Sequence, residues 1–331
     1  MNHQYLYSAS LIKTLEKDLL SAEQLNRLLA SETGQDIKNA LTDTFIGHGL
    51  AENEEQTLTL AQVNELLEKA ILEAKNILTN SAPEPEILGL IWLKYDLHNI
   101  RAFLTSRGLN LSDENTNKRW ISPLGQYHPP LLLEACENAS LKWIRPEWEI
   151  IDDLIKRPDQ LNYQIDANID LAYLLSVDKI AQIASPFIKE YTSTIIDFHN
   201  IINYLRHNTD QSISPPLAPS GSVSPEQLQQ LTKEEALKLF YRFGGESTWK
   251  EAVEEYLETE QFTALTKNID NYLIDWLIEN SRKNVFSVAT LLSYFNNKKN
   301  DARIIRSVVS GLLAGLDPQL IKNNLRKIRH A

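Results

Sequence analysis

The chain has little glycine, a single cysteine and no long apolar run. Its 331 residues include eleven glycines, and Cys136 is the only thiol, so an internal disulfide is excluded. The longest apolar candidate, 308–316, contains Ser310, Gly311 and Gly315 and is shorter than the ~18 residues that a membrane span requires. We therefore expect any membrane association to be peripheral.

Positive charge is also scarce. The formal net charge of −11 argues against nucleic acid or anionic lipid as a partner for the whole surface. Polar Asn2, His3 and Gln4 precede the first apolar pair, and no long hydrophobic core of a signal peptide follows them. We expect a cytoplasmic protein that binds no nucleic acid.

The composition favours helices. Strands require β-branched alternation bounded by turn residues, whereas this chain has long stretches rich in Leu, Ile, Glu, Lys and Gln. An all-α fold is predicted, with helices over 5–30 (a second turn series opening at Ser21), 64–80, 87–107, 148–156, 169–183, 185–206, 228–240, 248–260, 263–279, 285–313 and 317–328. Residues 112–119 are expected to form a loop, and Ser224-Pro225-Glu226 is typical of a helix start.

One helix signature occurs three times. It begins at Asp96, Asp197 and Asp301, which are 101 and 104 residues apart. Positions +1, +4 and +8 after each aspartate form one apolar stripe: Leu97, Ile100 and Leu104; Phe198, Ile201 and Leu205; Ala302, Ile305 and Val309. The aspartate lies at the edge of this stripe.

A second landmark keeps nearly the same period. Pro123-Leu124-Gly125 followed by Pro129 matches Pro219-Ser220-Gly221 followed by Pro225, at a spacing of 96 residues. Self-similarity at a fixed period predicts a repeated structural unit. We predict three similar helical lobes, 1–120, 121–215 and 216–331, with the three aspartates at equivalent points.

Catalytic chemistry is not indicated. Asp96 and His98, like Asp197 and His199, are two residues apart, so on a helix they point about 200° away from each other and cannot hold one metal ion. We instead expect Asp96 and Asn99 to form a polar pair that satisfies backbone groups of the next helix. Cys136 is expected to be buried, no phosphate-binding loop occurs, and no cofactor or metal is predicted.

The end of the chain is basic. Residues 298–331 carry a net charge of +6 and the remaining chain −17. These cations form either a solvated helix end or a docking surface for an acidic partner. Lys322, Arg326 and Arg329 are the candidate docking residues, because their spacings of four and three place them on one face of the final helix.

These motifs resemble one family: the C subunits of the V/A-type (vacuolar/archaeal-type) rotary ATPases, the counterparts of the d subunit in the eukaryotic vacuolar enzyme. Lys94 to Arg101 is similar to the family's K-Y-D-x-x-N-[LI]-[KR] helix, and Ile196 to Ile201 with Leu205-Arg206 continues the likeness. The segment 298–325 is similar to its C-terminal pattern. The signature residues are Asp96, Asn99, Arg101, Asp197, Asn200, Arg206, Asp301 and Arg306; the departures from the family pattern are Ile202, Ile304 and Asp301.

The resemblance implies a funnel of three lobes in pseudo-threefold arrangement. Such a subunit sits on the membrane proteolipid ring, receives the rotor shaft (D/F-like subunits) and catalyses nothing. It would be present as a single copy on the cytoplasmic side, peripheral to the membrane through the complex. Two other hypotheses remain: a free-standing helical scaffold or adaptor, and a helical enzyme with an unrecognised site.

Overall fold

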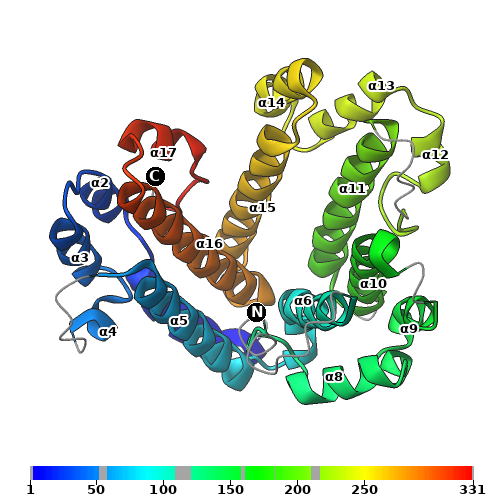
Figure 1. Cartoon of the computed structure of the whole chain (residues 1–331), viewed down its shortest axis with the longest axis horizontal. Coiled ribbons are helices and arrows are strands. Elements are labelled where there is room, and N and C mark those ends of the chain that lie inside the picture. The colour runs from blue at the N-terminus through cyan, green and yellow to red at the C-terminus, as the bar shows by residue number, and fades with distance from the viewer. Residues whose placement is uncertain are drawn as a thin grey trace. The chain divides into compact units, whose positions relative to one another are not determined.

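A computed structural model describes residues 3–51, 58–108, 121–157, 161–182, 184–209 and 217–329. In these ranges the regular elements are all helical, as predicted (Figure 1). None of the helices in the described ranges is long and apolar enough to span a bilayer. The chain divides into two compact units, one formed by 1–85 with 266–331 and the other by 86–265. The expected lobe boundaries near 120 and 215 and the expected loop over 112–119 lie outside the described residues, so the three-lobe division stays a prediction.

The first unit joins the two ends of the chain. It contains η1 (His3–Tyr5), α1 (Leu6–Leu15), η2 (Glu16–Asp18), α2 (Ala22–Leu29), α3 (Gly34–Thr42), α4 (Gly47–Ala51), α5 (Leu60–Ser81), most of α15 (Thr263–Lys283), α16 (Val288–Leu313) and α17 (Pro318–Asn324). Capping boxes at Ser21, Thr33 and Thr59 start three of these helices. The long helix α16 packs along α5 and also contacts α1 and α2 (Figure 1), so early and late segments share one core.

The second unit holds the middle of the chain. It contains η3 (Pro85–Leu88), α6 (Gly89–Gly108), α8 (Pro129–Glu137), η4 (Leu141–Trp143), η5 (Pro146–Trp148), α9 (Glu149–Ile155), α10 (Leu161–Gln182), α11 (Pro186–Thr209), α12 (Pro225–Gln229), α13 (Lys233–Lys238), η6 (Leu239–Arg242) and α14 (Glu246–Thr259). Helix α10 packs against α6, α9 and α11. An aromatic cluster joins α11 to the following segments, because the Phe198 ring centroid lies 4.5 Å from that of Phe243 and 5.7 Å from that of Trp249.

The repeated apolar stripe is confirmed. Its nine members are all buried, with Ala302 the most exposed at 4 %. The stripe therefore faces the core on α6, α11 and α16, as the 100° periodicity predicts.

Three expected helices are shorter or broken. The helix over 5–30 is interrupted between η2 and α2, where Ser21 starts a new helix as expected. The helix over 228–240 is divided because Thr232 forms a capping box with Glu235 and starts α13. The helix over 317–328 ends at Asn324, because side chains replace its backbone bonds: Asn271 accepts from the Lys327 N–H, and Asn300 donates to the Lys327 carbonyl.

We predict that Phe198→Ala will lower the free energy of unfolding by about 3–5 kcal/mol, because it empties the centre of the aromatic cluster. The control is Leu257→Ala, since Leu257 is 46 % exposed on α14. It should change the free energy by less than about 0.5 kcal/mol. Urea denaturation of both variants measures this, and equal losses would contradict the assignment of this core.

Candidate functional site

The first signature aspartate binds the loop that precedes α8. Asp96, which is fully buried on α6, accepts hydrogen bonds from the backbone N–H groups of Gln126 (2.9 Å) and Tyr127 (3.0 Å). Asn99, one turn later, donates to the Ser122 carbonyl (2.9 Å) and accepts from the Ser122 N–H (2.7 Å). We call an aspartate with the backbone it holds an aspartate clamp. The expected polar pair exists, but it satisfies the loop before the next helix and not the helix itself.

The second clamp repeats this geometry on α11. Asp197 accepts from the Val223 N–H (3.1 Å) and the Ser222 hydroxyl (2.6 Å). Asn200 donates to the Ala218 carbonyl (2.8 Å) and accepts from the Ala218 N–H (2.9 Å). Both acidic and amide members are buried.

The glycine of each Pro-x-Gly landmark is required by these clamps. A Cβ atom on Gly125 would lie 2.2 Å from Oδ1 of Asp96, and one on Gly221 would lie 2.3 Å from Oδ1 of Asp197. Any side chain at either position would push the loop away from the carboxylate. The repeated aspartate and the repeated glycine are therefore two halves of one contact.

The third clamp joins the two ends of the chain. Asp301, 1 % exposed on α16, accepts from the Leu20 N–H at 2.9 Å across 281 residues of sequence. Its other oxygen, Oδ1, is buried without a hydrogen bond among the described residues. Ile304 stands where the other two copies have asparagine, so the third copy lacks the hydrogen bonds that Asn99 and Asn200 make.

All three clamps hold the chain at the same register. The clamped amide lies two residues before the first residue of a helix: Tyr127 before Pro129 of α8, Val223 before Pro225 of α12, and Leu20 before Ala22 of α2. Each aspartate thus fixes the entry of a following helix, and for the third copy that helix lies at the start of the chain. This geometry supports the expected equivalence of the three aspartates.

The basic signature residues have three different environments. Arg101 forms ion pairs with Asp166 (2.8 Å) and Asp170 (3.2 Å). Arg206 lies over the Phe262 ring at 5.5 Å from its centroid. Arg306 donates to the amide oxygen of Asn64 at 2.7 Å. The three basic signature residues therefore do not share one kind of interaction partner.

The prediction that three cations share one face of the final helix is wrong. Of the three candidate cations only Lys322 lies on α17, and it is exposed. Arg326 pairs with Asp270 at 3.0 Å, and Arg329, whose side chain is 6 % exposed, pairs with Glu16 at 2.6 Å. These two cations stabilise the unit internally, because their partners come from α15 and η2.

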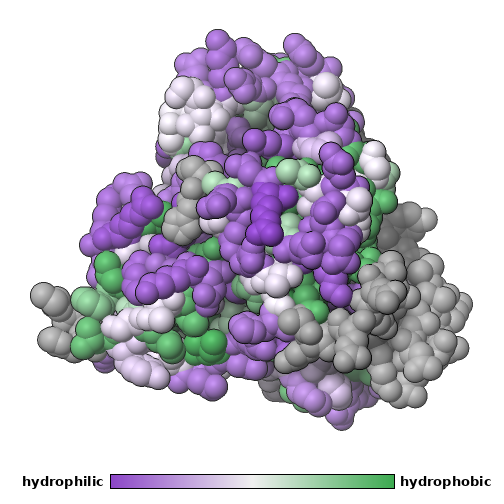
Figure 2. Space-filling view, turned by 90° about the vertical axis from the view of Figure 1, so that its left-hand side faces the viewer, coloured by the Kyte–Doolittle hydropathy of each residue, from purple (hydrophilic) through white to green (hydrophobic). Residues whose placement is uncertain are grey.

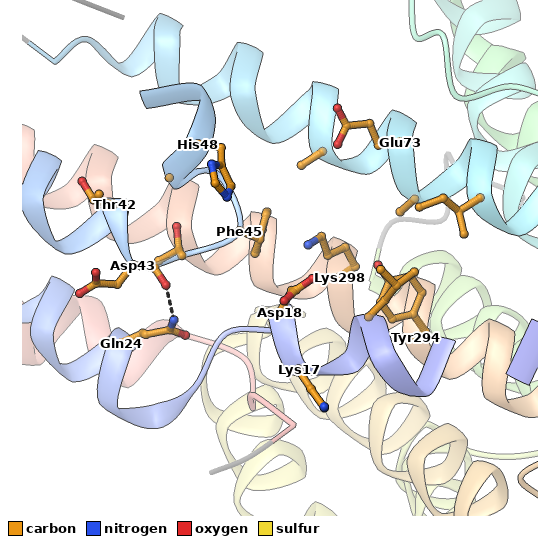
Figure 3. Close-up of a pocket in the computed structure, with 16 residues that line it drawn as sticks. Lys17, Asp18, Gln24, Thr42, Asp43, Phe45, His48, Glu73, Tyr294 and Lys298 are labelled. Carbon is orange, nitrogen blue, oxygen red and sulfur yellow. Dashed lines mark hydrogen bonds between the residues drawn. The ribbon is translucent and has the colours of Figure 1, made fainter. Parts of the chain in front are cut away.

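A cleft of about 530 Å³ opens in the first unit (Figure 3). Its lining comes from α1, η2, α2, α3, α4, α5 and α16 and includes Lys17, Asp18, Gln24, Asp43, Phe45, His48, Glu73, Tyr294 and Lys298. The Lys298 ammonium lies 3.6 Å from the centroid of the Phe45 ring, a cation–π contact. Both acidic and basic side chains line the cleft, and no three metal-ligating side chains gather within the described ranges.

Burial changes the acidity of three groups on α16, two of which line this cleft. It lowers the pKa of Lys298 to about 8 and raises the pKa of Tyr294 to about 12. It also raises the pKa of Asp301 to about 7, although the Leu20 N–H and the cations Lys298 and Arg329 favour its ionised form. The third clamp therefore titrates near neutral pH.

Sequence reasoning missed one buried carboxylate. Asp152, fully buried on α9, accepts from the N–H groups of Leu141 (2.8 Å) and Lys142 (2.8 Å) and fixes the turn η4. Its surroundings in the sequence carry no repeat of the signature, so no local signal could have identified it. Cys136, in contrast, is buried on α8 as expected.

Comparison with known proteins assigns the chain to one group. The family model described as ATP synthase (C/AC39) subunit matches residues 9–324. The C subunit of the A-type ATP synthase of Methanocaldococcus jannaschii is 22% identical over 97% of this chain and 86% of its own length. The C subunit of the V-type sodium ATPase of Enterococcus hirae is 20% identical over 96% of this chain and 97% of its own length.

The hydrogen bonds of the first clamp should contribute to the stability of the fold. Asp96→Leu should lower the free energy of unfolding by about 1–3 kcal/mol, because it leaves the Gln126 and Tyr127 N–H groups without an acceptor. Asp153→Leu, on the exposed side of α9, is the matched control and should have almost no effect. Thermal and urea melts compare the two, and equal effects would show that the clamp contributes nothing.

The free energy of unfolding should depend on pH through Asp301 of the third clamp. Because the folded-state pKa of Asp301 is about 7 against an ordinary 3.8, the folded chain holds a proton that the unfolded chain releases between these values. The contribution of Asp301 to the stability of the fold is complete below pH ~4 and is lost as the pH rises to ~7. The stability of Asp301→Asn relative to the natural chain should therefore rise with pH across this window, whereas that of Asp153→Asn should not. Urea melts at several pH values test this. If the free energy of unfolding of Asp301→Asn changes with pH in parallel with that of the natural chain, the prediction is wrong.

Proposed function

The chain belongs to the ATP synthase (C/AC39) subunit family, and on this premise we propose that it is a non-catalytic central-stalk subunit of a V/A-type rotary ATPase. In this role it couples the central shaft (D/F-like subunits) to the membrane proteolipid ring, as a single copy on the cytoplasmic side. The observation that carries the proposal is the extent of the match: residues 9–324 fit one family model, and the relatives are named as C subunits of such ATPases.

The clamps suit such a mechanical role. A body that transmits torque between two partners must deform little under load, and close-packed helices have low compressibility. Each clamp adds a buried hydrogen bond between a core helix and the entry of another helix. Relative motion of these elements would leave a buried carboxylate or N–H unpaired, which costs about 1–3 kcal/mol for each group.

We expect the protein to copurify with ATPase subunits. An affinity tag on the chain, in cells that produce it, should recover shaft and proteolipid-ring subunits from detergent-solubilised membranes, as identified by mass spectrometry. A tag on an unrelated cytoplasmic protein of similar charge is the control. Recovery of the chain alone, or with proteins unrelated to an ATPase, would favour a free-standing scaffold instead.

The isolated protein should not bind nucleotide. Calorimetric titration with Mg-ATP should give no saturable heat in the micromolar range, because the sequence has no phosphate-binding loop. A saturable micromolar site, or hydrolysis by the purified chain, would overturn the non-catalytic assignment.

A further inference from the structure

Three exposed leucines lie together in the sequence where α16 turns into α17. Leu313, Leu316 and Leu320 are 44 %, 49 % and 53 % exposed, and every residue over 313–320 is exposed. We call this segment the leucine tip. On the face that Figure 2 shows, hydrophilic residues predominate and hydrophobic ones form small separate groups. Most large apolar side chains of the described residues are buried, so three exposed leucines in this short segment require an explanation.

The leucine tip has a fixed conformation. Helix α16 ends in a Schellman motif, in which Leu316 N–H donates to the Gly311 carbonyl (2.9 Å) and Gly315 adopts a φ of 74°. The Asp317 carboxylate then accepts from the N–H groups at the start of α17 and fixes its direction. A surface with a fixed shape loses little conformational entropy when a partner binds it.

Leu316 is exposed for a specific reason. In a Schellman motif the residue at this position usually packs on the side chain of a residue in the last turns of the helix, and the facing residue here is Gly311. Ile321 fills that place, since a Cβ atom on Gly311 would lie 2.6 Å from its Cδ1 atom. Ile321 is buried as a result, and Leu316 is left facing outward.

Two cations near the leucine tip have no acidic partner among the residues that the structure describes. Several other cations of the basic end are paired internally: Arg303 and Arg326 with Asp270, Lys327 with Asp275 and Arg329 with Glu16. Lys322 on α17 and Arg306, two turns before Leu313 on the same side of α16, form no ion pair among the described residues. Asp317 is the one acidic residue of the tip, and it caps α17.

We propose that the leucine tip is a docking surface for a protein segment with an apolar centre and carboxylates at its edge. The leucines would cover the apolar centre, and Lys322 and Arg306 would face the carboxylates. This inference rests on the proposed function, because the partner is a subunit of the same ATPase. It also moves the predicted docking role from Arg326 and Arg329, which are paired internally, to Lys322 and its apolar neighbours.

A protein partner fits this surface better than a lipid surface. The chain carries a net charge of −11, so an anionic membrane would repel it as a whole. Two cations beside the tip give only a weak attraction to anionic headgroups. Vesicle binding is therefore the outcome that would favour lipid instead.

The test is rebinding of purified full-length protein to membranes from cells that lack its gene but retain the other ATPase subunits. Relative to the natural chain, L316Q/L320Q should weaken rebinding at least about tenfold, and R306E/K322E should weaken it several-fold and reduce its dependence on salt. The controls are Leu257→Gln and Lys238→Glu, at other exposed positions. Circular dichroism melts should be unchanged in all four variants.

The outcomes separate this inference from the proposed function. If the natural chain rebinds and both tip variants rebind equally well, the leucine tip is not the docking surface, while the ATPase assignment stands. Binding of the natural chain to protein-free phosphatidylglycerol vesicles, lost in L316Q/L320Q, would overturn the protein partner. No rebinding of the natural chain would count against the proposed function and with it this inference.

Discussion

A buried carboxylate that accepts hydrogen bonds from a distant stretch of backbone is the constraint on which this structure depends. Asp96, Asp197 and Asp301 lie at the edge of the apolar stripe and bind amides 31, 26 and 281 residues away, respectively. Each apolar stripe buries its helix, and each carboxylate fixes where another helix begins. Packing alone would permit several positions of that entry, whereas the paired carboxylate permits one.

The third clamp differs from the other two in ways that follow from its position. It connects the start and the end of the chain, lacks the asparagine and leaves one carboxylate oxygen without a hydrogen bond among the described residues. Burial then raises the pKa of Asp301 to about 7. The unit that contains both chain ends therefore depends on a weaker, pH-sensitive form of the contact that the other unit contains twice.

Local patterns predicted much of this structure, and long-range pairing accounts for the rest. The all-α fold, the buried stripe and the helix start at Ser21 follow from periodicity and capping within a few residues. The partner of Asp301 could not be predicted, because nothing near Leu20 repeats the Pro-x-Gly landmark. For the same reason the final helix was predicted too long: its end depends on Asn271 and Asn300, which are far away in the sequence.

Hydrogen exchange of the clamped amides tests the central claim most directly. Mass spectrometry of peptides that cover Leu20, Tyr127 and Val223 measures all three clamps in one sample of the natural protein. We expect these amides to exchange far more slowly than amides of exposed loops, with Leu20 the least protected of the three above pH ~7. Exchange of the three at the rate of ordinary loop amides would contradict the view that buried aspartates hold this protein rigid.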